Sequence, residues 1–338
     1  MNIIWDLLDR SVVQNLFMRH VLPCYDGAKA LSVNKIHPVK KLIWQTTYHI
    51  VFRYDVSLDY LERVDNIEIY CTAHSSEPRK NVYQTLNFLQ RNNFANNEFL
   101  AIPKPLFYNQ KFNASFYQGV EGVNLYTHIK ENHRADIESI LFEAARWLSR
   151  LHQMPVRANK LFNQPNSRLE TVFPGSKHVI DDVRRCYPEY LGLYEKFYDF
   201  FIKSEEACLS GIKKLSLIHG DAHPENVVKL HDGRLALIDY TDMSYGDYAR
   251  DLGTFLQQLE YMAGRKLNNK QYVDKLKKIF LESYLGLSNI KMTPELEERI
   301  KVYYNWTAIR TATFFLLKHD PQPERAEPLI RMVESNLN

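Results

Sequence analysis

The strongest constraint on the fold is a stretch in the second half of the chain, residues 217–242. It reads LIHGDAHPENVVKLHDGRLALIDYTD, in which two runs of apolar residues flank an Asp-Gly pair. Asp-Gly between alternating apolar residues favours a β-hairpin with a two-residue type I′ turn. Polar residues stand at the outer ends of this predicted hairpin, with Asn226 at one end and Asp239 at the other. The segment therefore predicts a local structure that holds polar groups at a fixed spacing.

The register of this hairpin determines which polar residues meet. If Asp-Gly at 232–233 forms the turn, Asn226 faces Asp239, whereas a three-residue turn shifts the register by one and removes this pairing. Directly opposed residues have Cβ atoms about 4.5–5.5 Å apart. An amide oxygen and a carboxylate at that separation can share one hard cation such as Mg²⁺. Asp221 precedes the hairpin on a loop from which it can reach a substrate hydroxyl, so the spacing predicts a phosphoryl-transfer site.

The composition limits the classes of protein to which the chain can belong. With 338 residues, 45% of them hydrophobic, it is long enough for two domains or one two-lobed enzyme. Its 43 Lys and Arg residues are interspersed with 40 acidic residues, so no basic stripe predicts a nucleic-acid partner or an anionic membrane. The four cysteines include no CxxC pair, which disfavours a zinc site and a disulfide framework. No apolar run is long enough to predict a membrane span. The separated cysteines are typical of a reducing compartment, so we expect a cytoplasmic protein, of undetermined oligomeric state.

The first part of the chain is typical of a small antiparallel sheet. Residues 41–57 and 64–74 are rich in Ile, Val, Tyr and Thr with partial alternation, which predicts strands. Helical periodicity and alternation predict two helices and one more strand, in chain order over residues 1–20, 80–91 and 111–118. Together these elements predict an N-terminal lobe over residues 1–118.

The remaining residues, 119–338, have mainly helical patterns and predict a larger C-terminal lobe that contains the hairpin. Asp136 is placed to cap a helix whose apolar stripe ends before Pro155. Another aromatic-rich helix is expected over 188–209. The predicted fold class is therefore α+β, with a small sheet-bearing lobe and a helical lobe.

Two helices are expected after the hairpin. Asp247 is placed to cap the first of them, and Gly264 is expected to end it. Thr293 and Pro294 are expected to open a long final helix as N-cap and first helical residue, running to about Lys318.

Three segments in this order, HGDAHPEN, IDYTD and GDYARDLG, resemble the C-terminal half of the aminoglycoside phosphotransferase and choline kinase superfamily. These proteins are small-molecule kinases with a protein-kinase-like fold. The resemblance implies that Asp221 is the catalytic base and that Asn226 and Asp239 bind Mg²⁺. It also implies that His219 braces the loop and that His223 lies near the transferred phosphate, with a plain loop histidine as the alternative. Histidines four residues apart also suggest a zinc pair, but the oxygen ligands favour Mg²⁺.

The resemblance extends to FYQGVEGVNL at 116–125, which corresponds to an inter-lobe hinge, and to WLSRLH at 147–152. It implies that backbone groups near Tyr117, Gln118 and Gly119 contact the base of ATP or GTP. The implied acceptor is a small hydroxyl-bearing molecule, and a protein kinase is disfavoured because no APE-like segment follows IDYTD. Further acidic residues match family positions and are expected to be architectural: Asp242, Asp247 and Asp251.

One part of the kinase pattern is missing from the first lobe. Kinases of this fold hold the α and β phosphates with a lysine on the third strand, paired to a glutamate on the following helix. The plausible lysine positions hold Cys71, Thr72 and Ala73, and no glutamate stands where the helix needs one. Substitute positive charge is available from Lys35, Lys40, Lys41, Arg53, His74 and Lys80. Two alternatives remain, a working kinase with a substitute cation and a pseudokinase that acts as a binding or regulatory module.

The acceptor pocket is expected between Asp221 and the C-terminal helices. Aromatic and basic residues recur in that region: Tyr303, Tyr304, Trp306, Arg310, Phe314 and Phe315. Aromatic residues at this spacing are typical of a core, but they can also form a cage for a quaternary amine. Arg310 in an apolar stretch needs an anionic partner, either from the fold or from a substrate carboxylate or phosphate. Sugars, amino alcohols and aminoglycosides all remain candidate acceptors.

Overall fold

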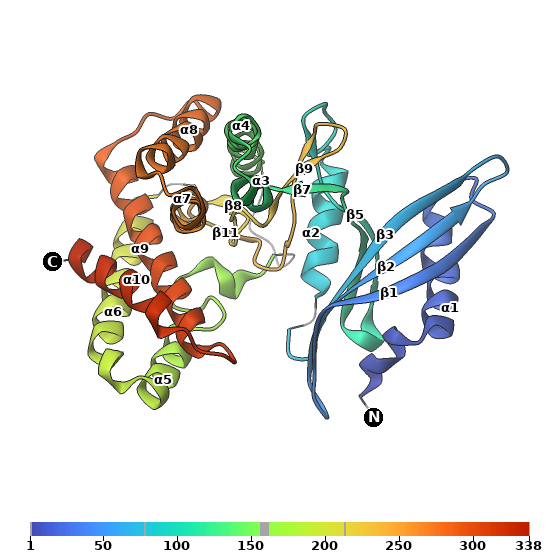
Figure 1. Ribbon diagram of the computed structural model, residues 1–338, viewed down its shortest axis with the longest axis horizontal. Helices are drawn as coiled ribbons and strands as arrows, with labels where there is room; N and C mark the ends of the chain where they lie inside the picture. The colour runs from blue at the N-terminus through green and yellow to red at the C-terminus, as the bar shows by residue number, and fades with distance from the viewer. Residues whose placement is uncertain (1, 78, 156–161, 213, 338) are drawn as a thin grey trace. The chain divides into compact units, whose positions relative to one another are not determined.

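The chain folds into two compact units. The structure, a computed structural model, describes residues 2–77, 79–155, 162–212 and 214–337. The first unit comprises residues 1–122 and 230–241, and the second comprises residues 123–229 and 242–338. The main antiparallel sheet belongs to the first unit and helices α3 to α10 belong to the second, which confirms the α+β class (Figure 1). The lobe boundary after residue 118 stays a prediction.

The first unit is built on a five-stranded antiparallel sheet. In spatial order its strands are β1 (Ala30–Ile43), β2 (Tyr48–Asp59), β3 (Val64–His74), β6 (Ala114–Gln118) and β5 (Lys104–Asn109). The helical elements of this unit are η1 (Ile3–Leu8), α1 (Arg10–His20), η2 (Leu22–Cys24), α2 (Lys80–Arg91) and η3 (Gln110–Phe112). Asp9 divides the predicted N-terminal helix in two, because its carboxylate accepts hydrogen bonds from the first backbone N–H groups of α1. The predicted strand at 64–74 and helix at 80–91 are confirmed.

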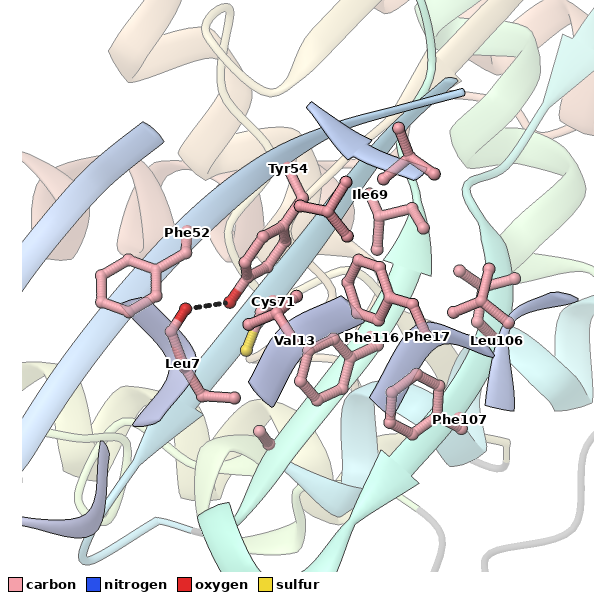
Figure 2. Packing of buried hydrophobic residues seen from close by; sticks show 14 of the residues in the cluster. Leu7, Val13, Phe17, Phe52, Tyr54, Ile69, Cys71, Leu106, Phe107 and Phe116 are labelled. Atoms are coloured by element: carbon pink, nitrogen blue, oxygen red, sulfur yellow. Dashed lines mark hydrogen bonds between the residues drawn. The ribbon is translucent and has the colours of Figure 1, made fainter. Parts of the chain in front are cut away.

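One face of the sheet packs against α1. Residues along β2 alternate strictly between buried and half-buried, so that every second side chain enters this core. Phe17 of α1 lies edge-on to Tyr54 and Phe116, with ring centroids 5.1 and 5.9 Å apart (Figure 2). The Tyr54 hydroxyl donates a hydrogen bond to the Leu7 carbonyl at 3.1 Å, which satisfies its one buried polar atom. The opposite face of the sheet is left to carry the polar side chains.

The first strand was only partly predicted. Residues 41–57, expected as one strand, are the end of β1, a turn and most of β2. The missed part of β1 carries Asn34, Lys35 and Pro38, residues with low strand propensity, and its pairing with β2 has two register shifts. Because β1 is an edge strand, proline is tolerated there, and β2 supplies the partner that the local sequence does not reveal.

The second unit is mainly helical. Its helices are α3 (Leu125–Glu131), α4 (Arg134–His152), α5 (Ser176–Cys186), α6 (Leu191–Gly211), α7 (Ala249–Leu267), α8 (Lys270–Ser288), α9 (Pro294–Leu317) and α10 (Pro323–Leu337), with short turns η4 (Gln164–Ser167) and η5 (Pro188–Tyr190). Two short strands, β8 (Ser216–Ile218) and β11 (Ser244–Gly246), pair antiparallel. In the part of the chain that the structure describes, no helix combines the length and hydropathy needed to cross a membrane.

Helix ends test the predictions made from capping residues. The Thr293 side chain accepts a hydrogen bond from the Leu296 N–H at the start of α9, as predicted. Asp136 lies in the first turn of α4 and is not its cap. Gly264 does not end α7, which continues to Leu267 and ends at Asn268 in the left-handed conformation, φ 47°. An Asn can adopt that conformation as glycine does, so a second C-cap signal existed four residues further on.

The hairpin at the centre of the sequence prediction has a different turn. The Leu230 N–H donates to the Arg234 carbonyl at 2.8 Å, which leaves three residues in the loop between the strands. Gly233 takes the left-handed conformation, φ +89°, as expected for a three-residue loop with a glycine bulge. Leu230 therefore pairs with Arg234 and not with Leu235, so the register argument that placed Asn226 opposite Asp239 is wrong. The strands end earlier than predicted, at β9 (Val227–Leu230) and β10 (Leu235–Leu237), and β4 (Leu100–Ala101) runs parallel to β10 while β7 spans Gly122–Asn124.

Candidate active site

The loop that follows β8 is held by a buried carboxylate from α7. Asp251 accepts hydrogen bonds from the backbone N–H groups of His219, at 2.7 Å, and Gly220, at 2.8 Å. His152 Nε2 contacts the same carboxylate at 2.9 Å, and its Nδ1 contacts the Tyr284 hydroxyl at 2.7 Å. Burial by itself raises the pKa of Asp251, but His152 and the loop N–H groups outweigh burial and hold the pKa below its ordinary value. These contacts make Asp251 structural, as expected.

Glycine is required at position 220. Its φ is +83°, and an added Cβ would lie 2.4 Å from the Asp242 carbonyl oxygen. The Gly220 carbonyl accepts a hydrogen bond from the buried guanidinium of Arg250 at 3.3 Å. His219 is fully buried, with its ring 6.1 Å from the ring of Trp147, and its predicted bracing role stays a prediction. The backbone directly before Asp221 is therefore fixed by Asp251, which accepts from its N–H groups, and by Arg250, which donates to its carbonyl.

Asp221 presents an ionised carboxylate at the surface of this loop. Its side chain is 44% exposed, and one carboxylate oxygen lies 3.7 Å from His223 Nε2. The Glu225 N–H donates to His223 Nδ1 at 3.3 Å, which assigns the ring proton of a neutral His223 to Nε2, facing Asp221. Removal from water by itself raises the pKa of Asp221, but His223 and Arg310 more than offset this and hold the pKa well below its usual range. A carboxylate of this kind can orient and accept the proton of an incoming hydroxyl.

Asn226 is oriented by the same loop. Its Nδ2 donates to the Asp221 carbonyl at 3.0 Å, and its backbone N–H donates to the His223 carbonyl at 2.9 Å. Within the described ranges, no residue donates to Asn226 Oδ1, which leaves an amide oxygen of the kind that Mg²⁺ accepts as a ligand. The side chain is buried, so its orientation is restrained.

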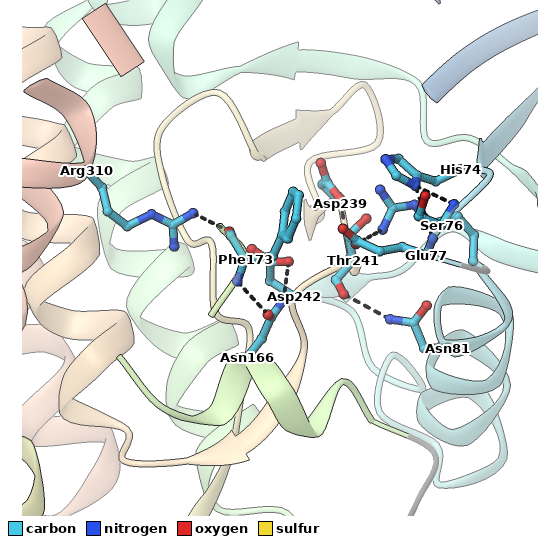
Figure 3. A network of polar contacts seen from close by, with 11 residues as sticks. His74, Ser76, Glu77, Asn81, Asn166, Phe173, Asp239, Thr241, Asp242 and Arg310 are labelled. Atoms are coloured by element: carbon cyan, nitrogen blue, oxygen red, sulfur yellow. Dashed lines mark hydrogen bonds and ion pairs between the residues drawn. The ribbon is translucent and has the colours of Figure 1, made fainter. Parts of the chain in front are cut away.

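Asp239, in the first unit, lies on a tight bend after β10. Its φ is 63°, an uncommon conformation for a residue other than glycine. Its Oδ1 accepts a hydrogen bond from the Thr241 N–H at 3.3 Å, and Asn81 of α2 donates to the Thr241 carbonyl at 2.9 Å (Figure 3). A left-handed aspartate costs about 1–2 kcal/mol, and residues held in this way concentrate at functional sites.

The predicted hinge residues lie at the end of β6. The Gly119 N–H donates to the Glu68 carbonyl at 2.9 Å, so this donor is used within the sheet. A Cβ at Gly119 would come within 2.5 Å of the Tyr70 ring, which explains the glycine. The Tyr117 ring stacks on Tyr70 at 6.0 Å, and Gln118 Oε1 accepts a hydrogen bond from a tyrosine hydroxyl near the N-terminus.

The positions on β3 where a phosphate-binding lysine is expected hold Cys71, Thr72 and Ala73. Cys71 and Ala73 are fully buried on the α1 face of β3, and Thr72 lies on the other face. Several of the substitute cations are already engaged within the first unit. Arg53 forms ion pairs with Asp55 at 3.3 Å and with a glutamate at 3.0 Å, and Lys41 lies 4.7 Å from an indole ring. His74 Nδ1 accepts two backbone N–H groups at 3.1 Å, so that nitrogen carries no proton.

Three of the candidate cations, Lys35, Lys40 and Lys80, form no ion pair with any described residue, and sequence reasoning missed a further cation, Arg79. Lys40 is paired with Val51 in the sheet register and makes no ion pair with any described residue. Partial burial lowers the pKa of the Lys40 ammonium, while the negative charge of Asp239 acts in the opposite direction. Arg79, just before α2, is 5% exposed and its Nη1 lies 3.1 Å from Glu77. We call Lys40, His49 and Arg79 the basic cluster, because burial, followed by the charges of Lys40 and Arg79, lowers the pKa of His49 to about 3.

A cavity of about 410 Å³ opens beside Asp221 and lies entirely within the second unit. Four of the six residues expected at the acceptor pocket line it: Trp306, Arg310, Phe314 and Phe315. The other two do not. The Tyr303 hydroxyl donates to Glu205 at 3.2 Å, and the Tyr304 hydroxyl donates to Glu260 at 2.9 Å. Sequence reasoning missed three further residues that line the cavity. Tyr261 and Lys318 lie in or at the end of predicted helices but were not assigned to the pocket, and Arg325 lies on α10, which was not predicted.

The fold and this loop define a kinase-like phosphotransferase. The chain belongs to the phosphotransferase enzyme family, whose family model matches residues 67–280. The small-molecule kinase class predicted from the three sequence segments is thereby confirmed. None of the curated proteins compared with the chain matches it.

Solved structures of small-molecule kinases share the fold over almost the whole chain. Spectinomycin phosphotransferase APH(9)-Ia, in complex with ADP and spectinomycin, is 12% identical with a TM-score of 0.54, covering 98% of this chain and 95% of that one. An ethanolamine kinase of Plasmodium vivax is 14% identical with a TM-score of 0.58, covering 97% and 94%. The choline kinase LicA of Streptococcus pneumoniae is 14% identical with a TM-score of 0.56, covering 90% and 93%. The two-lobed protein-kinase-like fold predicted from the sequence is confirmed.

Proposed function

We propose that the chain transfers the γ-phosphate of ATP or GTP to the hydroxyl of a small molecule, with Asp221 as catalytic base. The observation that carries this proposal is an ionised, solvent-accessible carboxylate on a loop fixed by buried Asp251, at the edge of a cavity large enough for a small molecule. Family membership supports the reaction class.

The residues support a direct in-line transfer. The acceptor oxygen attacks the γ-phosphorus, and the bond from that phosphorus to the bridging oxygen breaks, so that the nucleoside diphosphate leaves. The proton of the hydroxyl passes to Asp221 and then to water. His223 contributes positive potential beside Asp221, and His219 holds the loop through its backbone and its buried ring.

Asn226 and Asp239 are the proposed Mg²⁺ ligands. The Asn226 Oδ1 accepts no hydrogen bond from a described residue, and the Asp239 carboxylate is held on a left-handed backbone; each is a hard oxygen donor of the kind that Mg²⁺ prefers. When bound, Mg²⁺ would neutralise phosphate charge. The hydrogen bond from Asn226 Nδ2 to the Asp221 carbonyl supports this assignment, because it fixes which amide atom is available as a ligand.

We assign the phosphate-binding charge of the missing lysine to the basic cluster. Arg79 is paired with Glu77, whereas Lys40 forms no ion pair with any described residue, and its charge and that of Asp239 interact. The base of the nucleotide is proposed to contact backbone groups near Tyr117, Gln118 and Gly119; since the Gly119 N–H is used by Glu68, this contact would use the other backbone groups. Neither feature distinguishes ATP from GTP.

A pseudokinase is the second candidate, and the absence of a lysine on β3 favours it. Thermal unfolding with ATP, GTP and Mg²⁺, each alone and combined, separates the two functions. Stabilisation that needs nucleotide and metal together, followed by nucleoside diphosphate release with a hydroxyl compound, supports the kinase. Stabilisation by neither nucleotide would contradict it.

A further inference from the structure

The cavity beside Asp221 is lined by more positive than negative side chains. Its cations are Arg310, Lys318 and Arg325, and its carboxylates are Asp221 and Glu225. We propose that the acceptor is a hydroxyl-bearing anion, with a carboxylate or phosphate group held by these three cations. This inference rests on the proposed function, because it concerns the acceptor of that reaction.

Arg310 forms its contacts with neutral groups. Its Nη2 donates to the Phe173 carbonyl at 3.3 Å (Figure 3). Its guanidinium lies 4.9 Å from the centroid of the Trp306 ring. Both partners are neutral, and it forms no ion pair with any residue that the structure describes. A guanidinium binds carboxylate or phosphate in a planar, two-pronged geometry, so an anion is the ligand that Arg310 can still accept.

Arg325, from α10, is arranged in the same way. It donates to the Tyr261 hydroxyl at 2.8 and 3.1 Å and to Gln322 Oε1 at 2.8 Å, and it stacks on Phe315 with 3.8 Å to the ring centroid. These contacts hold the guanidinium in place but do not neutralise it, because all the partners are uncharged. Its charge therefore remains available to the cavity.

The aromatic rings of the cavity are already covered by the chain's own cations. Arg310 lies over Trp306, Arg325 over Phe315, and Lys318 over Phe314 with 6.0 Å to the ring centroid. A quaternary amine needs open aromatic faces, and here each of these rings already has a cation against it. The alternative of an aromatic cage for an amino alcohol is therefore disfavoured.

The charges that line this cavity favour an anionic ligand over a cationic one. An incoming cation would meet three positive groups and two carboxylates, Asp221 and Glu225, and an Asp221 paired with it would lose its role as a base. An anion bound by Arg310 lies close to Asp221, because both residues line the same cavity of about 410 Å³. A hydroxyl on the same small molecule can then reach the base.

Calorimetric titration of the full chain without nucleotide tests the charge of the acceptor. The probes are glycerol 3-phosphate, glycerate and uncharged glycerol, with choline and spectinomycin as cations. We expect one or both anionic probes to bind at least about tenfold more tightly than glycerol and the cationic probes to bind no better than glycerol. The ranking of glycerate against glycerol 3-phosphate identifies carboxylate or phosphate as the group recognised.

Variants link this binding to the named residues. Arg310→Gln and Arg325→Gln are each expected to lower the affinity for the anionic probe by about 10- to 100-fold, the usual effect of losing a charge-assisted hydrogen bond. Arg265→Gln is the matched control, since Arg265 also donates to the Tyr261 hydroxyl, at 2.6 Å, but does not line this cavity. Lys318→Gln is a second test with little risk of misfolding, because among the residues that the structure describes its ammonium interacts only with the Phe314 ring.

Three results would overturn the inference: tighter binding of choline or spectinomycin than of both anions, equal binding of the anions and glycerol, or unchanged anion affinity in the variants. Titration of the same protein with ATP and Mg²⁺ tests the kinase separately. Nucleotide binding without anion binding overturns only the acceptor charge. Anion binding that depends on Arg310, without nucleotide binding, overturns the kinase and leaves an anion-binding module.

Discussion

Asp251 binds the backbone N–H of His219 at 2.7 Å, and through this contact a helix carboxylate holds the loop that carries Asp221. Asp251 is fully buried and its second oxygen binds the next N–H of the loop, so that its charge is neutralised by His152 and by backbone dipoles. The position of the proposed base is therefore decided by a residue that does not contact substrate.

Replacing this carboxylate by Asp251→Asn is expected to lower the free energy of unfolding by about 3 kcal/mol or more, because it breaks a buried pair and turns an amide donor towards N–H groups. Urea denaturation measures the loss. Asp274→Asn is the control, since Asp274 pairs with Lys270 on the exposed surface of α8 and little change is expected. Equal stability of the two variants would contradict the structural role of Asp251.

Loss of the proposed base, in Asp221→Asn, is expected to lower kcat by about 10²- to 10⁴-fold and to leave nucleotide affinity almost unchanged. The reason is that the carboxylate acts on the acceptor proton and not on the nucleotide. Steady-state kinetics with separate nucleotide titrations give the two values. Asp232→Asn, in the exposed hairpin turn, is the control. Full turnover by Asp221→Asn would remove the base assignment.

The metal assignment predicts a change in Mg²⁺ dependence. Asn226→Ala and Asp239→Ala are each expected to raise the Mg²⁺ concentration for half-maximal activity by at least about tenfold, since even changes next to metal ligands have effects of that size. Nucleotide affinity measured with and without Mg²⁺ provides the second readout. Without Mg²⁺ the variants should bind nucleotide as tightly as the unsubstituted chain, and with Mg²⁺ they should bind it more weakly. If both variants still gain as much nucleotide affinity from Mg²⁺ as the unsubstituted chain does, other residues bind the metal.

Neighbouring lysines on β1 give an internal comparison for the phosphate-binding charge. Lys40→Ala is expected to raise KM for the nucleotide by about 10- to 100-fold, as for loss of a charge-assisted hydrogen bond, and to leave adenosine or guanosine binding unaffected. Lys41→Ala should change neither value, because Lys41 follows on the strand and lies against Trp5. Equal effects of the two substitutions would show that Lys40 has no special role.

The pKa of His49 predicts how stability depends on pH. Its folded value of about 3 lies below the value of about 6.5 for an unperturbed histidine, so the unfolded chain binds more protons between these limits. Stability contributed by neutral His49 is therefore complete above pH 6.5 and is lost as the pH falls towards 3. His49→Gln should flatten this part of a thermal unfolding profile, whereas His178→Gln, at an exposed position on α5, should not. An unchanged slope in His49→Gln would contradict the burial of this imidazole.

The sequence predicted best what depends on neighbouring residues. Thr293 and Pro294 predicted the start of α9, and its N-cap hydrogen bond is present, because a cap is formed within one turn of helix. The three motif segments predicted the family for the same reason, since their spacing is set along the chain. Local signals also failed when two competed, as at Gly264 and Asn268 near the end of α7.

Long-range pairing decided the rest. Most of β1 has low strand propensity and forms because β2 lies beside it, and one extra residue in the turn before Arg234 removed the predicted register of Asn226 and Asp239. Register depends on turn geometry, which the Asp-Gly pair alone does not determine.

The sequence by itself determined the α+β class, the kinase-like family and the residues from which a phosphoryl-transfer site can be made. Only the tertiary structure decided the surroundings of these residues: Asp251 beneath the loop, Lys40 and Arg79 in one basic cluster, and Arg325 against Phe315 in the cavity. The physical reason is that charge, burial and hydrogen bonding act over a few ångströms in space, between residues that are tens or hundreds of positions apart in the chain.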